Sequence, residues 1–217
     1  MARAARGRPA RLSRDAICQA ALDLLAETDA TTFSLRALGD RLGVDATAIY
    51  RHFQDKDDLL REVGDRALAP VTRGFVTSKD ARDDIRRMCT RLRKTLLRNQ
   101  VALTLTAYGP TRRENELRIT EVMLDALARC GLSEENAVIA YHALIEYTIG
   151  SAALDGPLAA PGADRRGTYR TWRADYAALP PEKYPASVRM SSKLYPSSDA
   201  VFDAGLDALI SGLTDGQ

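Results

Sequence analysis

The chain is short of the residue patterns that define several protein classes. Its three cysteines, Cys18, Cys89 and Cys130, are odd in number and far apart. They form neither a disulfide framework nor a paired-cysteine metal site, so we expect buried free thiols in a reducing cytoplasm. No window approaches about 18 consecutive apolar residues, and no apolar stretch follows the charged N-terminus. We therefore expect no membrane span, no membrane partner and no secretory signal.

Residues that carry catalysis are equally scarce. Only two histidines occur, His52 and His142. His142 and Glu146 form an i, i+4 pair on one predicted helix, which fits a packing or interface hydrogen bond better than half of a catalytic site. The sequence contains no nucleophile motif, no phosphate-binding glycine loop and no metal-ligand spacing. We expect a protein that is not an enzyme and that holds neither a metal ion nor another cofactor.

The 217 residues suit one large domain or two smaller ones, because 45% of them are apolar and 28% are charged. The formal net charge of +2 says little about partners. Five arginines and no acidic residue fall within the first 14 positions. We interpret residues 1–12 as a flexible basic arm, which is either a solvated tail or an arm that lies in a minor groove.

Apolar residues recur with helical spacing, and β-branched residues alternating with polar ones are absent. The sequence therefore predicts an all-α fold, with an N-terminal three-helix domain over residues 13–60 and a helical domain over residues 61–217. Prolines divide residues 180–196 into short pieces, and the stretch 156–167 is predicted as loop. The predicted helices span residues 14–28, 34–42, 45–52, 55–70, 79–98, 111–129, 133–154 and 198–213.

Residues 34–52 carry the clearest local signal. Ser34 can cap a helix whose leucines face one way, and Gly43 follows where the chain must turn sharply. Val44 and Ile49 can then pack back onto the leucines. Two short helices joined by a tight glycine turn form a helix-turn-helix, whose second helix enters the major groove of DNA. The alternative is an ordinary helical hairpin in an all-α protein.

Several separate features coincide within residues 13–60. They are a leading amphipathic helix, Phe33-Ser34-Leu35-Arg36 at the start of the second helix, Leu42-Gly43-Val44 at the turn, and Ile49-Tyr50-x-His52-Phe53-x-x-Lys56 after it. Together they resemble the N-terminal domain of the TetR family of bacterial repressors. Two positions depart from the family pattern. Asp29 replaces a usual glycine, and Gly39 replaces a usual alanine, either to permit closer helix approach or by drift.

The resemblance implies roles for the matching positions. Arg36 would reach a base or a phosphate, and Thr47 and Ala48 would face bases. Tyr50, His52 and Lys56 would bind the phosphate backbone, because a phenol, an imidazole and an ammonium each supply a donor. Arg51 would contact guanine, phosphate or solvent; His52 could instead pack on Phe53, and the Tyr50 ring could be partly buried. The predicted DNA-contacting set is Ser34, Arg36, Ala46, Thr47, Ala48, Tyr50, Arg51, His52 and Lys56.

The resemblance also implies a ligand pocket in residues 61–217. No cluster of arginine, lysine or carboxylate residues is visible in the sequence, so we expect a small apolar or aromatic effector. Taken singly, each candidate residue fits plain core better than a ligand contact. The candidates are Met88, Leu92, Leu103, Thr104, Tyr108, Met123, Leu127, Tyr147 and Trp172.

A dimer interface is the second feature that the resemblance implies. Small residues on the helices 133–154 and 198–213 allow close approach, and two such helices from each subunit would form a four-helix interface. The alternative is that both faces belong to the core of one chain. The residues assigned to the interface are Tyr141, Leu144, Ile145, Thr148, Phe202, Gly205, Leu206 and Leu209.

We therefore expect a cytoplasmic, ligand-responsive transcription regulator. It would bind a near-palindromic operator in double-stranded DNA as a homodimer, act as a repressor, and be released by a small molecule. The alternative is an all-α small-molecule-binding or interaction protein in which the helix-turn-helix only supports structure.

Overall fold

The structure, a computed structural model, describes residues 12–27, 32–106, 109–159 and 162–215. These residues form α-helices and one short 3-10 helix without any strand, which confirms the all-α prediction for this part of the chain. The elements are α1 (Arg14–Glu27), α2 (Leu35–Leu42), α3 (Ala46–Ile49), α4 (Lys56–Thr72), α5 (Ala81–Arg98), α6 (Gln100–Thr106), α7 (Glu114–Arg129), α8 (Glu134–Ala159), α9 (Arg165–Ala177), α10 (Pro185–Met190), η1 (Ser191–Lys193) and α11 (Ser198–Thr214).

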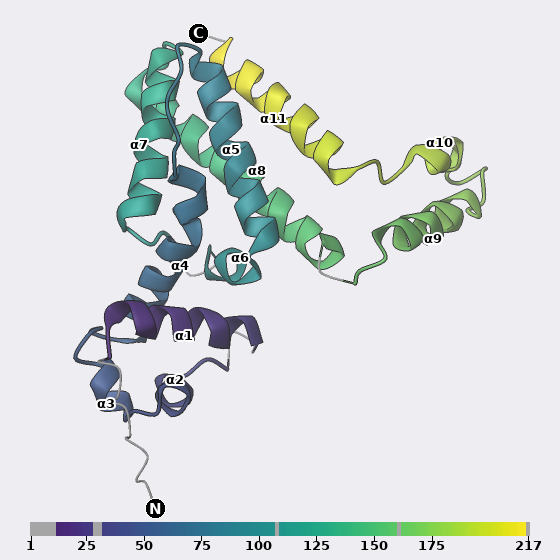
Figure 1. Cartoon of the computed structure of the whole chain (residues 1–217). Coiled ribbons are helices and arrows are strands. Elements are labelled where there is room, and N and C mark those ends of the chain that lie inside the picture. Colours follow the sequence, from purple (N-terminus) through teal and green to yellow (C-terminus); the bar gives the residue numbers. More distant parts are fainter. Residues whose placement is uncertain (1–11, 28–31, 107–108, 160–161, 216–217) are drawn as a thin grey trace, which may run out of the picture.

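The three N-terminal helices close around a small core of their own, drawn in purple and blue in Figure 1. Ile17 of α1, Leu38 of α2 and Ile49 of α3 are fully buried there. Leu59 and Leu60 at the start of α4 also belong to this core, as does Leu105 of α6. Each such side chain contributes about 1.5–3 kcal/mol when it is buried, so the start of α4 is an integral part of the N-terminal unit.

The larger core lies where α5, α7 and α8 meet, and α11 packs along α5 and α8 (Figure 1). Ile85, Met88 and Leu96 of α5 and Met123 of α7 are almost completely buried in it. The helix α4 runs without interruption from the N-terminal core into this one. The division at residue 60 that the sequence suggests therefore falls inside a continuous helix.

Helix ends differ from the sequence prediction where tertiary packing decides them. The sequence predicts a break at Pro70, but α4 continues to Thr72, and α8 passes through Pro157 into the stretch predicted as loop. Helices α6 and α9 lie in segments for which the sequence predicts no helix, and α3 ends at Ile49, three residues before the predicted end.

The helices α9 and α10 form an arm that extends away from the α5–α8 body (Figure 1). Neither helix contains a buried residue. The arm is held together by its own contacts, since Trp172 packs on Tyr195 at a ring distance of 4.9 Å and Arg173 donates to the carbonyls of Leu194 and Tyr195 at 2.7 Å. Its base is fixed by Arg165, which donates to the carbonyl of Leu158 at 3.2 Å.

Helix α8 is long and apolar. The sequence predicts no membrane span, because it has no long unbroken apolar run. Within the described residues, however, Glu134–Leu158 is long and apolar enough to cross a membrane, with a mean hydropathy of 1.3. Only 28% of its most apolar window is buried in this chain, and Ile139 and Leu154 are 57% and 83% exposed. A helix that is apolar on several faces also suits the interior of a helical bundle.

Candidate DNA interface and effector cavity

The helix-turn-helix has the local geometry that the sequence predicts. The Ser34 hydroxyl caps α2 by accepting from the backbone N–H of Ala37 at 3.1 Å. Gly43 ends α2 with φ of 65°, a left-handed conformation that glycine adopts without a steric cost. The chain then reverses, and the N–H of Val44 donates to the carbonyl of Gly39 at 3.0 Å.

The backbone after the turn approaches α2 so closely at Gly39 that a side chain does not fit there. A Cβ atom built there would lie 2.8 Å from the carbonyl oxygen of Val44 and 3.3 Å from the nitrogen of Ala46. Both neighbours are backbone atoms and cannot rotate away. The first of the two explanations offered by the sequence, closer helix approach, therefore accounts for this residue.

Helix α3 is short and is anchored to the N-terminal core. Ile49 is fully buried, while the Asp45 carboxylate caps the helix by accepting from the N–H of Thr47 at 2.8 Å. That hydrogen bond lowers the pKa of Asp45 from its ordinary value. Thr47 and Arg51 are exposed on the outer face, and Tyr50 is 54% exposed, so its ring is not part of the core.

The remaining predicted DNA contacts lie around this face. Arg36 is exposed on the first turn of α2, and Ala46 and Ala48 are half-buried. Half-buried His52 accepts at its carbonyl from Arg14 Nη1 at 2.5 Å. Lys56 Nζ donates to the carbonyl of Phe33 at 2.7 Å, which ties α4 to the loop before α2. A phosphate contact by Lys56 stays a prediction, and it would have to share this ammonium with Phe33.

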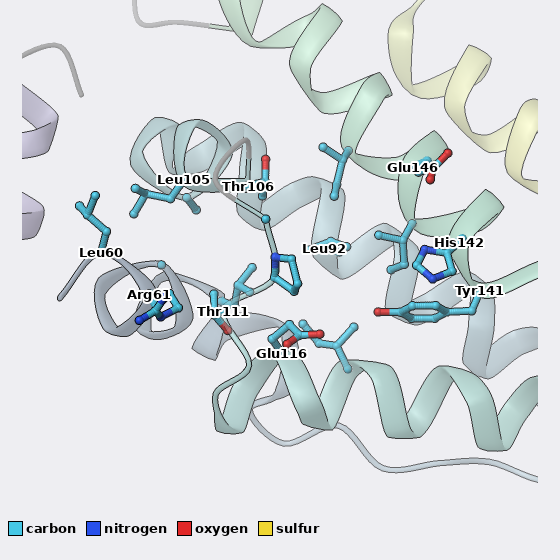
Figure 2. A pocket seen from close by; sticks show the side chains of 18 of the residues that line it. Leu60, Arg61, Leu92, Leu105, Thr106, Thr111, Glu116, Tyr141, His142 and Glu146 are labelled. Atoms are coloured by element: carbon cyan, nitrogen blue, oxygen red, sulfur yellow. The ribbon is translucent and has the colours of Figure 1, made fainter. Parts of the chain in front are cut away.

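A cavity of about 490 Å³ lies between the two cores, and Figure 2 shows most of its lining. Helices α4, α5, α6, α7 and α8 and the turn before α7 form its walls. Its apolar surface comes from Leu60, Leu68, Leu92, Ala102, Leu105, Ile119, Ile145 and Ile149. Its titratable and hydroxyl groups are those of Asp57, Arg61, Thr106, Thr111, Glu116, Tyr141, His142 and Glu146.

The cavity matches the pocket predicted from sequence at one residue, Leu92. Met88, Met123 and Leu127 are buried in the larger core, and Tyr147 stacks on Phe202. Leu103 and Thr104 lie on α6 outside the cavity lining, Trp172 lies on the arm, and Tyr108 lies outside the described residues.

The residues assigned to a dimer interface face inward instead. Tyr141 and Ile145 line the cavity. Leu144, Thr148, Phe202 and Leu206 are buried within the chain, and half-buried Leu209 packs against the same core. Gly205 leaves room for the Tyr147 hydroxyl, which an added Cβ would overlap. These contacts fit the alternative stated above, that both faces belong to the core of one chain.

Sequence reasoning missed the charged residues of the cavity because they are spread over three helices. Asp57 and Arg61 belong to α4, Glu116 to α7 and Glu146 to α8. A helical stripe at Asp57, Arg61, Gly64 and Leu68 could have marked the cavity side of α4. Charged residues that are far apart in the sequence therefore come together around the cavity in the folded chain.

The start of α7 is held by α4. Its N-cap residue, Arg113, makes no capping hydrogen bond. Instead, the Asp65 carboxylate of α4 accepts from the backbone N–H groups of Asn115 and Glu116 at 3.2 and 2.9 Å, from Asn115 Nδ2 at 2.9 Å and from Thr111 Oγ1 at 3.0 Å. Since Thr111 and Glu116 line the cavity, one cavity wall is tied directly to the helix that enters the N-terminal core.

Comparisons with known proteins place this geometry in a family. Residues 77–216 match the tetracyclin repressor-like, C-terminal domain, and residues 17–63 match the bacterial regulatory proteins, tetR family. An HTH-type transcriptional regulator of Saccharopolyspora erythraea is 30% identical over 93% of this chain and 84% of its own length. The tetracycline repressor protein class C of Escherichia coli is 26% identical over 94% of this chain and 91% of its own length.

The fold agrees with these matches. The Streptomyces coelicolor protein ActR, solved in complex with actinorhodin, superposes with a TM-score of 0.83 at 23% identity and covers 95% of this chain and 99% of its own. The two family matches together take in the helix-turn-helix, the start of α4 and the other helices around the cavity. The chain belongs to the TetR family of bacterial transcriptional regulators.

Proposed function

We propose that this protein is a cytoplasmic repressor that binds a near-palindromic operator as a homodimer and leaves it when a small, mainly apolar molecule fills the cavity. One observation carries the proposal. Leu60 and Leu105 are members of the N-terminal core and also line the cavity. A molecule in the cavity therefore touches the core on which α3 is seated.

The exposed face around α3 supports DNA binding. Thr47 is exposed on α3, which Ile49 anchors and Gly43 orients, and Tyr50 and Arg51 are exposed in the turn that follows this helix. Short polar and cationic side chains on such a face suit base edges and phosphates. At the N-terminus of α4 the Asp55 carboxylate already caps the N–H of Asp58, which leaves the N–H groups of Lys56 and Asp57 as the candidates for a phosphate contact.

The cavity supports a ligand-controlled function. Its volume lies within the range of small-molecule sites, and its lining is mostly apolar with a few polar groups. ActR, which shares the fold, holds actinorhodin in its solved complex. Helices α5, α6 and α7 line the cavity and also pack on α4, so an occupant of the cavity can bias the position of α4.

The outer face of α8 and α11 supports a homodimer. Leu154 and Val201 are 83% and 53% exposed, and Gly150 and Gly212 have open space where a Cβ would lie. Apolar and small residues on two neighbouring helices suit close packing against the same face of a second copy. This surface replaces the one that the sequence suggested, whose residues face inward.

A gel shift on the DNA upstream of the protein's own gene tests the proposal, together with the mass of the free protein by light scattering. We expect a dimer and salt-sensitive binding to one near-palindromic fragment. Tyr50→Phe should weaken binding to all DNA fragments about fivefold to tenfold, because one phosphate hydrogen bond is lost. Tyr184→Phe, an exposed tyrosine of the arm segment, serves as the matched control and should change nothing.

Base reading is tested by Thr47→Ala and Arg51→Ala. Each should relax the preference at one operator position by about 1–3 kcal/mol. An equal loss on all fragments would remove these residues from the set of base readers. No salt-sensitive binding to any near-palindromic fragment would favour the alternative, in which the helix-turn-helix only supports structure.

A further inference from the structure

The polar groups of the cavity are divided between two walls. Arg61 lies on the α4 side, whereas Glu116, Tyr141 and Glu146 lie on the side formed by α7 and α8 (Figure 2). The lining holds three carboxylates, including Asp57, against one guanidinium and the imidazole of His142. The α7–α8 side is thus negatively charged and is bordered by apolar side chains.

Hydrogen-bond direction is fixed on the α7–α8 side. Thr120 Oγ1 donates to Glu116 Oε1 at 3.0 Å, because a carboxylate accepts. Since the Thr120 hydrogen is used there, the 2.8 Å contact between Thr120 Oγ1 and Tyr141 Oη must be donated by Tyr141. Burial raises the pKa of the Tyr141 phenol, so its proton is present at neutral pH. Tyr141 Oη therefore has only lone pairs left to offer to a ligand.

The two carboxylates on this side lack a cationic partner among the described residues. Glu116 Oε2 accepts from the backbone N–H of Arg112 at 3.0 Å, which is a neutral donor. Glu146 makes no ion pair or hydrogen bond within the same part of the chain. His142 also lines this wall and carries an N–H donor, so acceptors and negative charge are concentrated at Glu116 and Tyr141. These two groups lie beside Ile119 and Ile145, where a charge-assisted hydrogen bond is stronger than in water.

We propose that the effector is a mainly apolar molecule that carries a protonated amine, held by the Glu116 carboxylate and the Tyr141 oxygen. The ammonium supplies both the donors and the positive charge that Glu116 and Tyr141 lack. No three His, Cys, Asp or Glu side chains of the described ranges are grouped as a metal site would require, so the partner is an organic cation. This inference rests on the cavity being the effector site.

Three fluorescent probes with one ring system test it: 9-(aminomethyl)anthracene, 9-anthracenemethanol and anthracene-9-carboxylate, titrated into the full-length protein. We expect the amine to bind roughly tenfold or more tighter than the alcohol, as one charge-assisted hydrogen bond provides. The carboxylate should bind weakest. Equal affinities, a preference for the carboxylate, or no binding of any probe by protein that shifts DNA would each overturn the inference.

Variants assign the preference to the α7–α8 wall. Glu116→Gln should reduce the amine-to-alcohol ratio to about twofold or less while the alcohol affinity stays constant, since the amide keeps its shape and loses the charge. Glu121→Gln removes an exposed carboxylate of the same helix outside the cavity and should keep the full ratio. A ratio unchanged by Glu116→Gln would also overturn the inference. If the unmodified protein does not bind DNA in the gel shift, by contrast, the proposed function is refuted, while the amine-to-alcohol affinity ratio can still be measured.

Discussion

Removal of the Asp65 carboxylate should uncouple α7 from α4. The Asp65 side chain is 5% exposed and accepts four hydrogen bonds from the turn and first residues of α7. Two of these come from backbone N–H groups at the helix N-terminus, which otherwise lack an intrahelical partner. Asp65 therefore acts as the cap of α7 although it belongs to another helix.

The magnitude follows from these bonds. Loss of an N-terminal cap costs about 0.5–2 kcal/mol, and each of the two side-chain bonds, from Asn115 Nδ2 and Thr111 Oγ1, adds about 1 kcal/mol. Removing the buried charge also removes its desolvation penalty, which offsets part of the loss. We expect Asp65→Ala to lower the free energy of unfolding by about 2–4 kcal/mol, and Asp65→Asn by roughly half as much, because one acceptor oxygen remains.

Urea denaturation followed by circular dichroism measures this change. All variants must be compared at one protomer concentration, since the stability of a dimer depends on it. Asp125→Ala is the matched control, because Asp125 is exposed and pairs only with Arg129 on its own helix among the described residues. Such a pair contributes about 0–0.5 kcal/mol. A loss for Asp65→Ala no larger than that of the control would refute the capping role.

Two further predictions concern buried titratable groups. Burial alone would raise the pKa of Asp84, but hydrogen bonds from Arg129 and the Ser78 backbone outweigh it and hold the pKa below the ordinary 3.8. The folded state thus binds this proton less tightly than the unfolded state. The contribution of ionised Asp84 to the free energy of unfolding is therefore fully present above pH 3.8 and is lost as the pH falls through the lowered pKa. Asp84→Asn should flatten the decline of stability at acid pH. A decline as steep as before would contradict this. Burial raises the pKa of the Cys18 and Cys89 thiols to about 11 and also raises the pKa of Cys130, but Cys130 is only partly buried. A disulfide reagent at neutral pH should therefore react with Cys130 first and with Cys18 and Cys89 only when the chain unfolds. Rapid labelling of three thiols in the folded protein would be the contrary result.

The N-terminal unit could be predicted closely because its signals are local. Ser34 caps α2 by accepting from the N–H three residues later, and Gly43 ends α2 through its own backbone conformation. The reason for Gly39 is different, since it depends on the carbonyl of Val44 that the turn brings back onto α2. The pattern alone left that residue with two explanations.

The cavity could not be predicted residue by residue because α8 is apolar around most of its circumference. Tyr141 and Ile145 face the cavity, while Leu144 and Thr148 face the core. Both pairs are spaced by four residues and run along the same helix, so helical periodicity detects the stripes without assigning them. The assignment is made by α5 and α7, which pack against one stripe and leave the other beside the cavity.

The two sides of the cavity must contribute differently to control of DNA binding. An effector that binds equally well in both positions of α4 leaves the DNA affinity unchanged, however tightly it binds. Contacts with Glu116 and Tyr141 lie on α7 and α8, whereas Leu60 and Arg61 lie on α4 itself. Coupling of about 1–3 kcal/mol, the usual range between two sites, therefore has to come from the α4 side or through Asp65. The ammonium site sets which molecule binds, and the fit against α4 sets how strongly that molecule releases the operator.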